Sequence, residues 1–218
     1  MEVPLEFDAL DNEKYIYNQE AAKLIDILLD FPSQFKNAEK VLEQSDIRLR
    51  TDYKNILVIG VGNPSTVAFK LLESVKENKL KIPACLISTK EIPSWVSSDT
   101  LIIAISHSGN TIEVLDAVDA LTERGFEIIA ITTGGRLKEK SDTQDKIKIL
   151  LYSAELLPRM ALGYCYVLLL EILAKANALS VSGFSRNEKD SIGWDDVENE
   201  LYKFTRELIP EIKIYKNT

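Results

Sequence analysis

Five runs of mostly apolar residues constrain the fold of this chain more than any other feature of its sequence. They are Asn55 to Gly62, Ala84 to Ser88, Thr100 to Ser106, Glu127 to Thr132 and, after a polar loop, Lys146 to Ser153. Continuous apolarity, rather than alternation, is typical of strands that are covered on both faces. The segments between the runs are long enough for crossover helices, so the sequence predicts an α/β fold with a central parallel sheet of about five strands.

The segment between the third and fourth runs has the pattern of such a helix. Apolar residues recur at every third position from Asn110 to Arg124, with Asn110 as a candidate N-cap and Glu113 at the capping-box position. After the fifth run, Pro158 suits the first position of a long apolar helix that reaches about Ala178. We therefore expect helices on both faces of the sheet.

The two ends of the chain differ from this middle. We expect amphipathic helices with charged outer faces over Asn12 to Leu29, Ser33 to Gln44 and Asp195 to Leu208, a loop over Ser180 to Trp194 and an extended end over Pro210 to Thr218. The prediction is a helical N-terminal extension that packs on the domain (residues 1–50), a main domain (51–180) and a C-terminal tail of loop, helix and linker (181–218).

The composition argues against several classes of partner. Net charge is −8 and no block of five or six lysines or arginines occurs, so we expect neither a nucleic acid nor a membrane as partner. The most apolar stretch, Met160 to Leu170, is interrupted by Glu171 and is shorter than the roughly 20 residues that cross a bilayer. Cys85 and Cys165 are too few for a disulfide framework, and Met1 to Leu10 has no secretory pattern. We therefore expect a cytoplasmic protein.

The most informative motif is SHSGNT, Ser106 to Thr111, directly after an apolar run and directly before a helical pattern. Ser106, Ser108 and Thr111 supply hydroxyl groups, Gly109 lets an anion approach the backbone, and the helix start adds free N–H groups. Hydrogen bonds to a charged group contribute roughly 1.5 to 3 kcal/mol each, which exceeds the screened repulsion from an acidic surface. The motif predicts a phosphate-binding loop, although the same residue types also form ordinary caps and turns.

Two further motifs favour the phosphate interpretation. Ile131 to Leu137 contains TTGGRL, in which paired glycines permit unusual backbone angles or a close approach to a ligand. Leu157 to Tyr164 reads LPRMALGY and puts Arg159 in the first turn of an apolar helix. Its guanidinium suits a phosphate or a developing enediolate, and the alternative is an exposed side chain at a helix end.

Together, SHSGNT, TTGGRL and LPRMALGY resemble the signatures of the sugar isomerase (SIS) fold, which implies a three-layer sandwich. More narrowly, the chain resembles the first half of the bifunctional phosphoglucose/phosphomannose isomerase family, which interconverts glucose 6-phosphate, mannose 6-phosphate and fructose 6-phosphate. The resemblance implies a hexose phosphate ligand, and the apolar helix around Tyr164 favours a homodimer. We expect no cofactor and no metal. The implied catalytic residue is Arg159, and the candidate substrate-binding residues are Gly62, Ser65, Ser106, Ser108, Gly109, Asn110, Thr111 and Gly134.

Two departures from that family pattern bear on binding and catalysis. Pro64 stands where a phosphate-contacting serine is expected, and proline has no N–H, so one contact is lost unless Ser65 replaces it. Family members also continue into a second domain with a catalytic glutamate, a histidine for ring opening and a lysine, whereas this chain ends at Thr218. His107 and Glu155 are weaker candidates for acid–base work, because a solvent-facing or ligand-side ring and a surface carboxylate are the commoner interpretations.

Two functions therefore stay open. The chain is either a partial aldose–ketose isomerase, which we favour, or a module that binds a sugar phosphate without converting it. A dinucleotide site is less favoured, because Ser65 replaces the third glycine of that fingerprint and the second apolar run ends without an acidic residue to hold a ribose.

Overall fold

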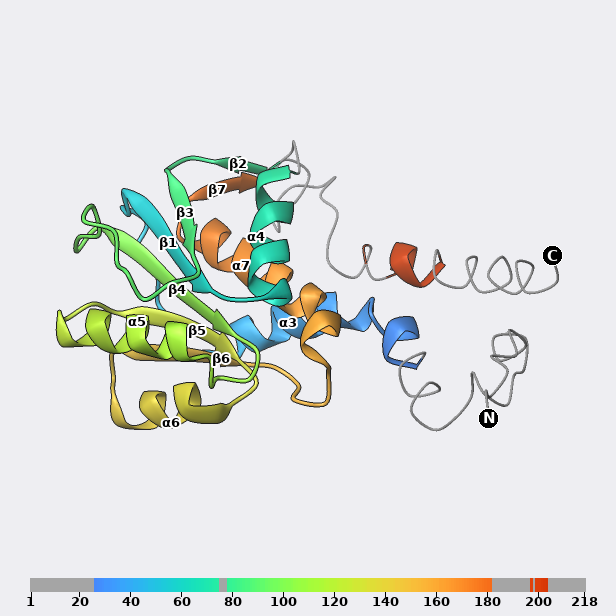
Figure 1. The fold of residues 1–218 in the computed structure, drawn as a ribbon. Helices are drawn as coiled ribbons and strands as arrows, with labels where there is room; N and C mark the ends of the chain where they lie inside the picture. Colours follow the sequence, from blue (N-terminus) through green and yellow to red (C-terminus); the bar gives the residue numbers. More distant parts are fainter. Residues whose placement is uncertain (1–25, 75–77, 182–196, 198, 204–218) are drawn as a thin grey trace, which may run out of the picture.

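Five parallel strands form the central sheet of the protein, in the order β3-β1-β4-β5-β6 (Figure 1). The computed structural model describes residues 26–74, 78–181, 197 and 199–203. Within these residues the sheet confirms the predicted α/β fold, and each strand coincides with one of the five apolar runs. The strands are β1 (Asn55–Gly60), β3 (Ala84–Ile87), β4 (Thr100–Ser106), β5 (Ile128–Thr132) and β6 (Ile147–Leu151).

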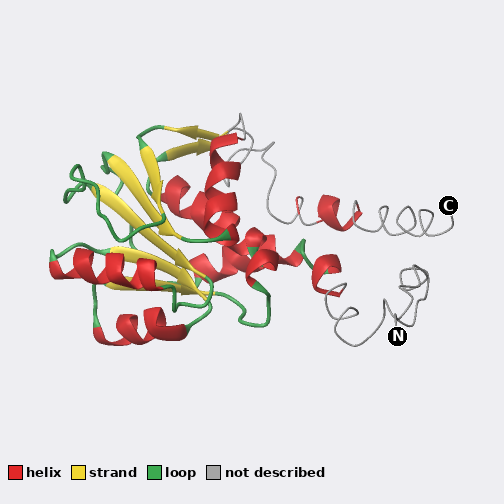
Figure 2. Ribbon diagram, viewed as in Figure 1, coloured by secondary structure: helices red, strands yellow, loops and turns green. Residues whose placement is uncertain are grey.

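Helices cover both faces of this sheet (Figure 2). The helices are α3 (Ser33–Glu43), α4 (Asn63–Ser74) and α7 (Leu162–Lys175) on one face and α5 (Ile112–Glu123) and α6 (Gly135–Thr143) on the other. Successive side chains of a strand point to opposite faces. Ile56 and Val58 of β1 therefore pack with the first group of helices, whereas Leu57 and Ile59 pack with the second. The inner strands β1, β4 and β5 are buried on both faces and almost wholly apolar, whereas the edge strands β3 and β6 are partly exposed.

The apolar segment after β6 is not one continuous helix. A short 3₁₀ helix, η2 (Pro158–Met160), comes first, and α7 then runs from Leu162 to Lys175. The predicted end near Ala178 was wrong, because Asn177 has a left-handed backbone (φ 55°) that cannot continue an α-helix. The break at Ala161 separates Arg159 from α7 and leaves it on a turn at the carboxyl edge of the sheet.

A second, two-stranded sheet was not predicted. It pairs β2 (Asn78–Leu80) with β7 (Leu179–Val181) in antiparallel register. Strands of three residues are too short to produce a hydrophobic pattern, so their pairing depends on α7 returning the chain to this position.

The predictions for the chain ends are only partly covered by the described residues. The helix predicted from Ser33 is confirmed as α3. Most of the helix predicted over 12–29 and most of the loop predicted over 180–194 lie outside the described residues, as does the segment 210–218. Of the helix predicted over 195–208, residues 197 and 199–203 are helical. No helix in the described part of the chain is long and apolar enough to span a membrane.

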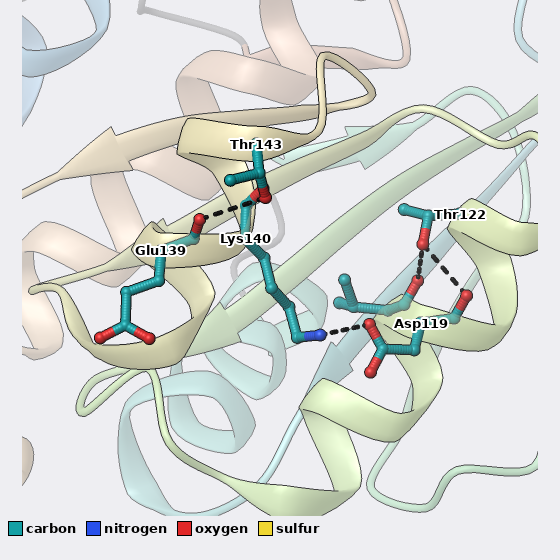
Figure 3. Close-up of polar contacts among 6 residues, drawn as sticks. Asp119, Thr122, Glu139, Lys140 and Thr143 are labelled. Atoms are coloured by element: carbon teal, nitrogen blue, oxygen red, sulfur yellow. Dashed lines mark hydrogen bonds and ion pairs between the residues drawn. The ribbon is translucent and has the colours of Figure 1, made fainter.

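An ion pair joins the two helices on the α5 side of the sheet (Figure 3). The Lys140 ammonium of α6 lies 2.6 Å from a carboxylate oxygen of Asp119 of α5. The same turn of α5 is closed by the Thr122 hydroxyl, which donates to the backbone oxygens of Val118 and Asp119. This contact joins α6, which follows the glycine-rich turn after β5, to α5, the helix of the preceding crossover.

Candidate functional site

A cavity of about 400 Å³ opens at the carboxyl edge of the sheet, where the predicted motifs meet. Three segments form it: the turn between β1 and α4, the loop between β4 and α5, and η2 with the residue before it. Ligands of open α/β sheets bind at this edge, outside the ends of the strands. Five of the nine predicted site residues line the cavity, namely Gly62, Ser65, Ser108, Thr111 and Arg159.

The SHSGNT loop keeps its own hydroxyl groups in a fixed arrangement. The buried Ser106 hydroxyl is hydrogen-bonded to the Thr111 hydroxyl at 2.8 Å, and Ser106 does not line the cavity. Ser108 is exposed, and its Oγ accepts a hydrogen bond from the Asn110 N–H at 3.2 Å. Thr111, not Asn110, is the N-cap residue of α5, so the predicted helix start was one residue too early. Ser108 and Thr111 are therefore the hydroxyl groups of this loop that border the cavity.

The glycines of the two loops bring their backbones together. Gly109 has φ +65°, and an added Cβ there would overlap the Gly134 carbonyl oxygen. In the same way, an added Cβ on Gly135 would overlap the backbone oxygen of Ser108. Neither Gly109 nor Gly134 lines the cavity. The paired glycines of TTGGRL thus permit a close approach to the neighbouring loop.

Asn110 links the same two loops through its side chain. Its Oδ1 accepts a hydrogen bond from the Arg136 backbone N–H at 3.1 Å, and its Nδ2 donates to the Ser108 backbone oxygen at 3.0 Å. The Thr133 N–H and hydroxyl both donate to the His107 backbone oxygen, at 3.0 and 2.7 Å. Asn110 does not line the cavity, so its observed contacts hold the loop rather than face a ligand.

The turn after β1 supplies the opposite wall of the cavity. Gly62 has φ +85°, and no atom lies within 4 Å of the position of an added Cβ, so this backbone is open to the cavity. Ser65 is buried, and its hydroxyl donates to the Gly62 carbonyl oxygen at 3.2 Å. Pro64 is the second residue of α4, where it removes one of the N–H groups that a helix start leaves without an intrahelical partner. Proline at position 64 therefore leaves this wall of the cavity with one N–H donor fewer, but it does not distort the helix.

The electrostatic environment of the cavity is favourable for an anion despite the acidic composition. Both α4 and α5 have their N-terminal residues at its rim, and each is 12 residues long. A helix N-terminus carries about half a positive charge and free N–H groups. Arg159 adds an exposed guanidinium, and within the described residues no carboxylate pairs with it.

A buried glutamine anchors the turn that carries Arg159, and sequence analysis missed it. Gln34 of α3 is 3% exposed, and its Nε2 donates to the Met160 backbone oxygen at 2.7 Å. Its Oε1 accepts from the Tyr164 N–H at 3.4 Å. Gln34 and Met160 are 126 positions apart in the chain, so no local pattern signals the contact.

His107 is half-buried and lies in the cavity wall. Its Nδ1 is 2.9 Å from the hydroxyl of Tyr152, a buried residue that follows β6. Tyr152 stacks on Tyr164 with ring centroids 5.0 Å apart, and it accepts a hydrogen bond from the Cys165 thiol at 3.8 Å. Burial lowers the pKa of His107, and a hydrogen bond to the Leu156 backbone opposes that shift. The ring is therefore hydrogen-bonded both to Tyr152 and to the Leu156 backbone, an arrangement that the sequence did not reveal.

The remaining candidate for acid–base chemistry lies outside the cavity. Glu155 lines a separate cleft with Asp30 and Tyr164. Among the residues that the structure describes, no group of three or more histidine, cysteine or acidic side chains is arranged to hold a metal ion.

The chain is similar to known proteins in sequence and in fold. Residues 51–144 match the SIS domain. This match covers less than half of the chain. It is 33% identical over 153 residues to the bifunctional phosphoglucose/phosphomannose isomerase of Caldicellulosiruptor bescii, over 70% of this chain and 44% of the relative. It is 37% identical over 112 residues to the enzyme of the same name from Thermoplasma acidophilum, over 51% of this chain and 33% of the relative. The chain therefore spans less than half the length of these two relatives.

A solved structure supports the fold. The C-terminal domain of glucosamine-fructose-6-phosphate aminotransferase from Francisella tularensis superposes with a TM-score of 0.55 at 17% identity, over 85% of this chain and 54% of the other. The predicted SIS fold is confirmed. The residues matched to the SIS domain include the SHSGNT and TTGGRL loops, whereas Tyr152 and Arg159 follow the matched segment.

Proposed function

We propose that this SIS domain binds a hexose phosphate, with the phosphate at the SHSGNT loop and the sugar beside Arg159. The observation that carries the proposal is the cavity of about 400 Å³, which is bordered by two helix N-termini, three hydroxyl-bearing residues and one guanidinium. Its volume lies within the range of about 300 to 1,000 Å³ that is typical of small-molecule sites. Glucose 6-phosphate, mannose 6-phosphate and fructose 6-phosphate are the expected ligands.

The phosphate would be held by direct and indirect contacts. In this proposal the phosphate accepts hydrogen bonds from the hydroxyls of Ser108 and Thr111 and from the first-turn N–H groups of α4 and α5. Each such bond contributes about 1.5 to 3 kcal/mol. Ser106 acts by holding the Thr111 hydroxyl, to which it is bonded. The other candidates, Gly62, Ser65, Gly109, Asn110 and Gly134, shape the turns around the phosphate.

The chemistry we propose is aldose–ketose isomerisation, with Arg159 stabilising the enediolate. Proton transfer between C1 and C2 also needs a base. No carboxylate among the described residues lines the cavity, so turnover needs a base from outside them. The same observation keeps open a module that binds a sugar phosphate without converting it. The homodimer and the cytoplasmic location stay predictions from the sequence.

Titration calorimetry with glucose 6-phosphate, fructose 6-phosphate and unphosphorylated glucose tests the binding proposal. The two phosphates should bind and glucose should not, because most of the binding free energy comes from the phosphate. The double variant Ser108→Ala, Thr111→Val should bind at least about tenfold more weakly, since it loses two hydroxyl donors to a charged group.

A matched control removes the same chemical groups far from the cavity. Ser74→Ala with Thr122→Val deletes one serine and one threonine hydroxyl near the C-terminal ends of α4 and α5. This control should bind like the unmodified protein. Absence of heat with every hexose phosphate, in a sample with native circular dichroism, would contradict the proposal. Conversion of glucose 6-phosphate to fructose 6-phosphate by this chain alone would show that a base is present after all.

A further inference from the structure

The segment from Tyr152 to Arg159 is held at both of its ends by buried polar groups. At one end, the Tyr152 hydroxyl contacts His107 Nδ1 at 2.9 Å, and the Tyr152 N–H donates to the Thr132 backbone oxygen at 3.2 Å. At the other end, Gln34 holds the Met160 backbone oxygen. Between these anchors the backbone carries the exposed Arg159 into the cavity wall. The position of the guanidinium therefore depends on both anchors.

His107 connects one of these anchors to the phosphate loop. Its backbone belongs to the SHSGNT loop, and its side chain reaches the Tyr152 hydroxyl, 45 positions away in the chain. The Cys165 thiol donates to the Tyr152 oxygen, so we infer that the Tyr152 hydroxyl donates its own proton to His107 Nδ1. The Nε2–H tautomer of His107 satisfies this chain of hydrogen bonds.

We propose that Tyr152 is a positioning residue for the sugar-phosphate cavity: through His107 it sets the spacing between the phosphate loop and Arg159. This inference rests on the proposed function. It assigns to Tyr152 the preference of the cavity for a sugar phosphate over free phosphate. Inorganic phosphate needs only the loop and the helix N-termini. A hexose phosphate must also reach Arg159, so its affinity depends on the spacing.

Calorimetry with Tyr152→Phe tests the inference, with inorganic phosphate and fructose 6-phosphate as the two probes. The substitution keeps the buried ring and its stacking on Tyr164 and removes only the hydroxyl. Fructose 6-phosphate should bind about threefold to tenfold more weakly, the effect of one lost hydrogen bond, while inorganic phosphate should bind as before. A general loss of stability would not change the ratio of the two affinities. Tyr53→Phe, a half-buried tyrosine just before β1, is the matched control.

The results separate the two proposals. Binding of fructose 6-phosphate with an unchanged affinity ratio in Tyr152→Phe would overturn the positioning role and leave the binding proposal intact. Failure of the unmodified protein to bind either probe would overturn both.

NMR of the imidazole gives a second measurement. His107 is the only histidine of the chain, so its ring signals need no separation from others. The nitrogen shifts should report the Nε2–H tautomer in the unmodified protein and a tautomer mixture in Tyr152→Phe. In the unmodified protein, fructose 6-phosphate should move the ring signals more than inorganic phosphate does. Equal responses to both probes would overturn the inference even if the variant failed to fold.

Discussion

Gly109 and Gly62 both have left-handed backbone angles, but their surroundings differ, and this contrast yields a prediction for stability. Gly109 has φ +65° and Gly62 has φ +85°. An added Cβ at Gly109 would overlap the Gly134 carbonyl oxygen, a backbone atom, whereas nothing lies within 4 Å of an added Cβ at Gly62. Alanine therefore meets backbone strain at both positions and a steric clash at only one.

The size of the effect follows from these two contributions. A left-handed conformation costs an alanine about 1 to 2 kcal/mol, which applies to both variants. Relief of the clash at Gly109 requires the SHSGNT loop to move away from the turn after β5, and overpacking of this kind costs roughly 1 to 3 kcal/mol more. We expect Gly109→Ala to lower the free energy of unfolding by about 2 to 5 kcal/mol and Gly62→Ala by about 1 to 2 kcal/mol.

Urea denaturation followed by circular dichroism measures both values, with Gly62→Ala as the control for backbone strain. The m-values should stay equal, because neither substitution changes the surface exposed on unfolding. Equal losses in the two variants would refute the reasoning, since they would mean that the two loops are not in contact at Gly109.

Two further predictions concern buried groups. Cys165 is fully buried, and burial raises its pKa to about 12. A thiol reagent at pH 8 should therefore modify the half-buried Cys85 in the native protein and Cys165 only after unfolding. Rapid modification of a folded Cys85→Ala variant would contradict this prediction. Gln34→Ala should lower the free energy of unfolding, measured by urea denaturation, by about 2 to 3 kcal/mol, because it leaves backbone groups of Met160 and Tyr164 without their partner. As a control, Gln44→Ala at an exposed position should change this free energy by less than about 0.5 kcal/mol.

The parallel sheet could be predicted because its signal is local. Each strand is a run of mostly apolar residues such as Thr100 to Ser106, and burial of both faces of the inner strands favours apolar side chains at successive positions. The position of the loops after the strands could also be predicted, because the carboxyl ends of parallel strands meet at one edge of the sheet. The motifs alone assign Ser108, Thr111 and Arg159 to one site, and these three residues do line one cavity.

The details of the loops could not be predicted, because they depend on partners far away in the chain. Asn110 looked like a helix cap, but its side chain bonds to the Arg136 backbone, and Thr111 takes the cap position. The paired glycines after β5 looked ready for a ligand, but the neighbouring loop occupies the space beside Gly135.

The sequence by itself determined the fold class, the five strands of the central sheet, and the edge of the sheet at which polar residues gather. These properties follow from hydrophobic periodicity and turn chemistry over a few neighbouring residues. The tertiary structure alone decided which of those residues face the cavity and what holds them there. Tyr152 and Gln34 act on His107 and Met160 across 45 and 126 positions, and hydrogen bonds between such distant residues form only when the sheet has brought their helices and loops together.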